Sequence, residues 1–104
     1  MAVRTKQHAS RVLADVTDDH RFFCQDGFIC KDLAGLSECL SHISQQVYSY
    51  HVSDNKNDFS NWIQDILGDK TLADTLLGIK KPAEAAKIVS ERIAWLRKKL
   101  NQVN

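Results

Sequence analysis

The apolar positions after residue 31 recur every three or four residues, which is the spacing of amphipathic helices. A first helix is predicted to begin at Asp32, because aspartate commonly caps helix N-termini. Its apolar stripe is Leu33, Leu36, Leu40 and Ile43. The next stretch, 45–52, fits a short helix and a short strand about equally well.

Two shorter helices are predicted further along the chain. The first begins at Asn57 or Asp58 and ends at Gly68, and its inward residues are Phe59, Trp62, Ile63 and Ile66. The second is capped by Asp69 and closed by Gly78, and its apolar residues are Leu72, Leu76 and Leu77.

The last predicted helix has Pro82 in its first turn and runs to about Leu100. Its apolar residues alternate spacings of three and four, like the a and d positions of a coiled coil, over fewer than three heptads. Two interpretations stay open: the helix packs on the core of its own chain, or it forms a dimer seam. The predicted seam is Val89, Ile93, Leu96 and Leu100.

Residues 21–31 predict a β-hairpin, because Asp26-Gly27 suits a two-residue type I′ turn between aromatic and β-branched flanks. In that register Cys24 faces Ile29 and Phe23 faces Cys30, so Cys24 and Cys30 point to opposite faces. Since an isolated hairpin is marginal in water, we expect it to lie against helices or to pair with the hairpin of a second copy.

These elements predict an α+β fold that is mostly α: an N-terminal β-hairpin followed by four or five helices, the last one long. Residues 1–20 are predicted to form a basic, partly mobile arm, and residues 21–104 a single globular domain. A chain of 104 residues with 43% apolar and 26% charged residues has the composition of a domain that folds unaided. It lacks a bilayer-spanning apolar run and a secretory signal, which favours a cytoplasmic location.

Cys24, Cys30 and Cys39 are odd in number and include no Cys-x-x-Cys pair, which disfavours a disulfide framework and a zinc site. We expect buried free thiols. Cys39 and His42 lie three residues apart on one helix, but two ligands do not make a zinc site. No metal or cofactor is therefore predicted.

The densest group of polar and aromatic residues lies at 48–62. The alternation of Asp54, Lys56 and Asp58 is that of a calcium loop, but Lys56 puts a cation at a ligand position and Phe59 replaces the required glycine. His51 could act as a general base oriented by Asp54 or Asp58. No accompanying nucleophile turn, phosphate loop or second histidine at metal spacing is present, so the protein is not predicted to be an enzyme.

A structural role for this segment is preferred. His51 then donates to a backbone carbonyl or a carboxylate, and Asn57 or Asp58 caps the helix that buries Phe59 and Trp62.

Short motifs run from the hairpin to residue 96: Tyr50-His51, Lys56-Asn57-Asp58-Phe59, Trp62-Ile63, Leu67-Gly68-Asp69, Leu72-Ala73, Arg92-Ile93 and Trp95-Leu96. In these motifs the chain resembles a small family of prokaryotic domains of unknown function. The resemblance implies a bacterial or archaeal cytoplasmic origin. It brings no activity, cofactor or catalytic residue with it.

Charge is segregated along the chain, although the net charge is only +1. Residues 1–12 carry +3, residues 13–78 carry −7 and residues 79–104 carry +5. Two basic ends around an acidic body can contact a polyanion or the acidic body of another copy. A simpler explanation of the basic last segment is a solvent-exposed face whose cations complement the dipole of the last helix.

We therefore expect a small non-enzymatic DNA-binding protein, nucleoid-associated or regulatory, that binds phosphates as a homodimer or larger oligomer. The alternative is a protein-interaction or assembly module that does not bind nucleic acid. The predicted phosphate-binding residues are Arg4, Lys6, Arg11, Lys80, Lys81, Lys87, Arg92, Arg97, Lys98 and Lys99.

Overall fold

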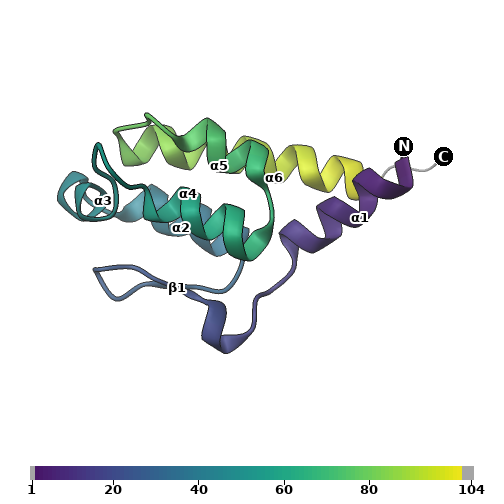
Figure 1. The fold of residues 1–104 in the computed structure, drawn as a ribbon, viewed down its shortest axis with the longest axis horizontal. Helices are drawn as coiled ribbons and strands as arrows, with labels where there is room; N and C mark the ends of the chain where they lie inside the picture. Colours follow the sequence, from purple (N-terminus) through teal and green to yellow (C-terminus); the bar gives the residue numbers. More distant parts are fainter. Residues whose placement is uncertain (1, 102–104) are drawn as a thin grey trace.

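The computed structural model describes residues 2–101, with side chains from residue 5 onward. In chain order the elements are α1 (Ala2–Leu13), η1 (Asp18–His20), β1 (Phe22–Phe23), β2 (Ile29–Cys30), α2 (Leu33–His42), α3 (Gln45–His51), α4 (Asp58–Trp62), η2 (Ile63–Leu67), α5 (Lys70–Leu76) and α6 (Pro82–Leu100). Figure 1 shows α6 along the long axis of the molecule, with α1 at one end of it. The predicted fold class is confirmed: a mostly helical domain with a short hairpin and a long last helix.

The prediction of an N-terminal arm is wrong for residues 2–13, which form α1. Ala9 and Val12 are fully buried, and α1 packs against α6, α2 and η2. The reason is that Thr5, Ala9 and Val12 recur at helical spacing and give the helix one narrow face without charge. The basic residues Lys6 and Arg11 lie outside that face and are exposed.

The hairpin is present, but its predicted register is wrong by one residue. Phe22 pairs with Cys30 and Phe23 with Ile29, and the amide of Cys24 donates to the carbonyl of Phe28 at 2.9 Å. The loop thus has three residues and ends in Gly27 at φ +97°, a left-handed conformation that glycine adopts without strain. Cys24 and Cys30 therefore face the same side, which is buried against the helices.

Side-chain caps begin the central helices where the sequence placed them. Asp32 accepts from the amide of Gly35 at 2.8 Å, and Asp69 accepts from that of Leu72 at 3.1 Å. Asn57, and not Asp58, caps α4. The ambiguous stretch 45–52 is a helix over Gln45–His51, capped by Ser44.

α4 continues directly into η2, a π-helical turn. The amide of Gly68 donates to the carbonyl of Ile63 at 2.8 Å, and Gly68 ends the turn at φ +85°. The predicted stop at Gly68 is confirmed. The chain can therefore start α5 at once, with Asp69 as its cap.

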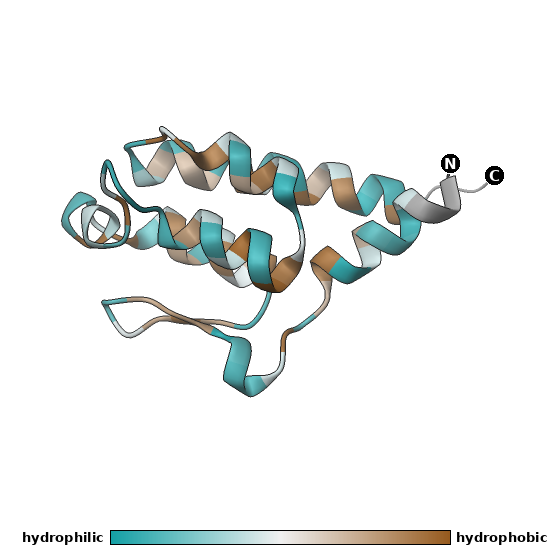
Figure 2. Ribbon diagram, viewed as in Figure 1, coloured by the Kyte–Doolittle hydropathy of each residue, from teal (hydrophilic) through white to brown (hydrophobic). Residues whose placement is uncertain are grey.

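The apolar face of α6 is used by its own chain. Val89 and Leu96 are fully buried, Ile93 is nearly so, and Leu100 packs against the same core, where α6 contacts α2 and α1. Figure 2 shows the alternation of hydrophobic and hydrophilic residues along this helix. Val89, Ile93 and Leu96 are buried within one copy, and Leu100 is partly buried. This agrees with the interpretation in which the helix packs on its own core, and it leaves little apolar surface for the predicted dimer seam.

None of the helices within residues 2–101 is both long and apolar enough to cross a bilayer.

Candidate nucleic-acid interface

The fold brings the two basic ends of the sequence together. α1 and α6 are packed against each other, so the start of α1 and the last turns of α6 lie at the same end of the molecule (Figure 1). Residues 2–14 and 92–101 contain seven lysines and arginines and no aspartate or glutamate. We call the described lysines and arginines of α1 and of the last turn of α6 the basic end: Lys6, Arg11, Arg97, Lys98 and Lys99.

The cations of the basic end are free to meet a ligand. Lys6, Arg11, Arg97 and Lys98 are exposed, and Lys99 is partly so. Among the side chains of residues 5–101, none of these five makes an ion pair with a carboxylate. The side chain of Arg4 lies outside the described part of the chain, although its backbone belongs to α1.

Arg11 reaches from α1 to the junction of η2 and α5. Its guanidinium carbon lies 2.8 Å from the position that a Cβ atom on Gly68 would occupy. Any side chain at residue 68 would displace this guanidinium, and the φ of +85° also favours glycine there. Arg11 therefore lies directly beside the segment that also receives Arg92.

Arg92 has a structural role and should be removed from the predicted phosphate contacts. Its Nε and Nη2 atoms donate to the two carboxylate oxygens of Asp69 at 2.8 and 3.0 Å. Asp69 is fully buried, and it also caps α5. A buried bidentate pair of this kind holds its guanidinium in place, so Arg92 ties α6 to α5.

Trp95 lies on the exposed flank of α6 next to this pair. The guanidinium carbon of Arg92 is 4.4 Å from the ring centroid, and Nζ of Lys99 is 5.3 Å from it. Both distances are within the range of cation–π attraction. In the sequence, the signal for this cluster is the spacing of Trp95 from Arg92 and Lys99, three and four residues, which brings the three side chains to one side of a helix.

Lys80, Lys81 and Lys87 do not join the basic end. Lys81 precedes α6, and Arg97 follows it by sixteen positions, which corresponds to about 24 Å of helix. Nζ of Lys80 lies 3.6 Å from a carboxylate oxygen of Asp54. The predicted cations whose side chains the structure describes thus fall into separate groups, and among these the basic end combines residues from both ends of the sequence.

Lys80 instead lines a groove of about 610 Å³ between α3, the loop 53–57 and the connection from α5 to α6. The hydroxyl of Tyr48 donates to the carbonyl of Ile79 at 2.7 Å, and Nε2 of Gln45 donates to that of Lys80 at 2.9 Å. These two hydrogen bonds connect α3 to the segment between α5 and α6, which form two walls of the groove. Burial raises the pKa of Tyr48 to about 12 and so favours the protonated hydroxyl that donates this hydrogen bond.

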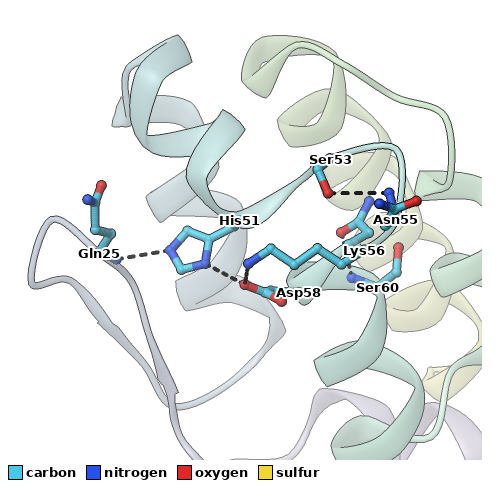
Figure 3. Close-up of polar contacts among 8 residues, drawn as sticks. Gln25, His51, Ser53, Asn55, Lys56, Asp58 and Ser60 are labelled. Carbon is cyan, nitrogen blue, oxygen red and sulfur yellow. Dashed lines mark hydrogen bonds and ion pairs between the residues drawn. The ribbon is translucent and has the colours of Figure 1, made fainter.

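His51 fastens the hairpin to the helices (Figure 3). It is only 4% exposed, its Nε2 accepts from the amide of Gln25 at 3.0 Å, and its Nδ1 lies 3.0 Å from a carboxylate oxygen of Asp58. An amide can only donate, so the ring proton sits on Nδ1 and is donated to Asp58. Lys56 binds the same oxygen at 3.1 Å. The nitrogen that a general base would use is already occupied.

The rest of the predicted structural motif lies around His51. Phe59 is buried and packs on Tyr48 and Phe22, with ring centroids 5.5 and 5.1 Å apart. Trp62 donates from Nε1 to the carbonyl of His20 at 2.8 Å. The preferred structural role of His51, Asn57, Asp58, Phe59 and Trp62 agrees with these contacts.

The three thiols lie in the core beneath the hairpin. Cys24, Cys30 and Cys39 are free and buried. The neighbouring Cys30 thiol and burial raise the pKa of Cys39, and burial raises the pKa of Cys24 to about 12. Protonated thiols are poor nucleophiles and poor metal ligands. No group of three or more His, Cys, Asp or Glu side chains in the described structure could hold a metal ion.

Comparison of the chain with protein families, with curated proteins and with solved structures finds no match. The family resemblance inferred from the motifs therefore stays a prediction.

Proposed function

We propose that this protein is a small non-enzymatic DNA-binding protein that contacts phosphates through the basic end. The proposed role is nucleoid-associated or regulatory, in the cytoplasm of a prokaryote. Contacts to phosphates fix a protein on DNA and carry no sequence information by themselves, so the proposed binding is not sequence-specific.

The observation that carries this proposal is the packing of α1 against α6. It sets α1, which carries Lys6 and Arg11, against α6, whose last turn carries Arg97, Lys98 and Lys99. Cations gathered on one surface release counterions from the same stretch of backbone, whereas scattered cations do not. Four or five such contacts are in keeping with non-specific dissociation constants of about 1–100 µM at physiological salt.

The non-enzymatic part of the proposal is supported by the environment of His51. A general base needs an accessible lone pair within hydrogen-bond reach of a substrate. The lone pair on Nε2 already accepts from the amide of Gln25. The ring is also covered by Phe22 and Phe59, with centroids 5.2 Å away in each case.

A second candidate function is self-assembly through the hairpin. Phe23 and Ile29 face each other across the two strands on the side away from the core, and they are 61% and 50% exposed. An apolar pair on a short, uncovered hairpin is a surface that a second copy can cover. Light scattering of Phe23→Lys/Ile29→Lys beside the wild type tests it, and an unchanged mass would remove it.

The DNA proposal is tested by fluorescence anisotropy with a labelled duplex of about 20 base pairs at low salt. Arg97→Ala/Lys98→Ala removes two exposed charges from the basic end. We expect its dissociation constant to rise at least about tenfold, because about half of the phosphate contacts are lost.

Lys80→Ala/Lys81→Ala is the matched control. It removes the same number of charges just before the start of α6, at the opposite end of that helix from Arg97 and Lys98. We expect affinity to change by less than about twofold. Equal losses in the two variants would contradict a localised basic end. Failure of the wild type to bind either the duplex or its separated strands at low salt would remove the proposed function.

A further inference from the structure

The exposed face of α6 presents one large aromatic side chain at the basic end. Trp95 is 40% exposed, whereas the other tryptophan, Trp62, is buried. Trp95 lies on the flank of the helix, outside the buried stripe that contains Ile93 and Leu96. Its ring is therefore not needed to fill the core, and it is accessible beside Lys99 and Arg92.

The ring is held in place from one side. Arg92 is anchored by two hydrogen bonds to Asp69, and Asp69 is itself fixed by burial and by its bond to the amide of Leu72. The guanidinium of Arg92, 4.4 Å from the ring centroid, is thus a rigid support for Trp95. An aromatic ring that is already immobilised loses less conformational entropy when a ligand stacks on it.

Lys99 contacts the ring in a different way. Its ammonium group is 5.3 Å from the ring centroid, and it stands at the end of a flexible side chain without an ion pair among the described residues. A cation–π contact at an exposed site is weak, and stacking of a base on an aromatic ring is stronger. A base can therefore displace the ammonium group, which is then free to bind the adjacent phosphate.

Arg11 supplies a second cation close by. It lies against Gly68, and the next residue, Asp69, holds Arg92 under the ring. An aromatic ring with lysine and arginine side chains near it has the features of a site for single-stranded nucleic acid, in which bases stack and cations follow the backbone. Bases in a duplex are stacked on one another and cannot use the ring.

We propose that Trp95 is a stacking platform for an unpaired base, and that the basic end binds single-stranded nucleic acid more tightly than duplex. This inference rests on the proposed function, because it assigns a substrate class to the same surface. Arg92 and Asp69 position the ring, and Lys99 and Arg11 bind the flanking phosphates.

The test compares a labelled oligothymidylate of about 12 nucleotides with a duplex of the same length, by anisotropy at low salt. We expect Trp95→Ala to weaken single-strand binding by about 5- to 100-fold and duplex binding by less than about twofold. Trp95→Phe keeps an aromatic face and is expected to retain most of the affinity. Urea unfolding of each variant shows whether the fold is kept.

Intrinsic fluorescence gives a second readout, because a base stacked on Trp95 quenches its emission. Oligothymidylate should quench the wild type, and Trp95→Phe, in which only buried Trp62 emits, should show no quenching. If the wild type binds neither strand form, the proposed function fails and the platform with it. If the wild type binds both forms equally and Trp95→Ala changes neither affinity, phosphate binding by the basic end is retained and base stacking on Trp95 is contradicted.

Discussion

The roles of His51 and Arg92 are decided by the partner that each side chain meets. His51 lies within hydrogen-bond distance of Asp58, as a catalytic histidine does of its carboxylate. Its other ring nitrogen, Nε2, accepts a hydrogen bond from the hairpin amide of Gln25. Arg92 is one of seven bases in the last segment, but it is bound to a buried carboxylate 23 residues away in sequence. The sequence gives residue types and spacings along one helix, and it cannot give these distant partners.

The buried thiols make a prediction about pH at the same scale. The pKa of Cys24 is raised by burial to about 12, against an ordinary value of 9.0. The folded state thus keeps a proton that the unfolded chain releases, so this stabilisation is fully present below pH 9 and is lost as the pH rises toward 12. Between pH 8 and pH 10 the free energy of unfolding should fall by about 1 kcal/mol more in the wild type than in Cys24→Ala.

Urea unfolding of the two proteins at both pH values measures this difference. The pKa of Tyr48 is raised in the same direction, but Tyr48 is present in both proteins and its effect cancels. Parallel changes in the two proteins would contradict the buried position of the Cys24 thiol.

Single elements were predicted well where the signals are local. The caps Asp32 and Asp69, the stop at Gly68 and the start of α6 at Pro82 each depend on a few neighbouring residues, and all four are confirmed. The hairpin register was wrong because Asp-Gly fits both a two-residue and a three-residue loop. Only the packing of the hairpin on the helices selects the register in which Cys24 is buried.

α1 was missed because its apolar face is narrow and its charge is conspicuous. Since Val12 is fully buried, we expect Val12→Ala to lower the free energy of unfolding by about 2 kcal/mol in urea denaturation. Ser10→Ala, at an exposed position of the same helix, should change it by less than about 0.5 kcal/mol. An unchanged stability of Val12→Ala would mean that residues 2–13 are the arm that the sequence suggested.

For the whole molecule, the sequence showed the charge segregation but not its arrangement in space. The heptad spacing of α6 predicts an apolar face, but it does not say whether the same chain or a second copy covers that face. In the structure, the core of the same chain covers it. The packing of α1 on α6 then divides the predicted cations into a basic end and a separate group near Lys80 and Lys81. Charge that was distributed along the sequence becomes localised in the fold.

The dependence of DNA affinity on salt concentration tests this localisation most directly. Four to five phosphate contacts predict a slope of about −4 in a plot of log K against log salt concentration, which is a loss of roughly 100-fold or more between 50 and 200 mM salt. Anisotropy titrations of the wild-type protein across that range give the slope. A slope near zero, or no binding at 50 mM salt, would contradict a basic end that binds phosphates.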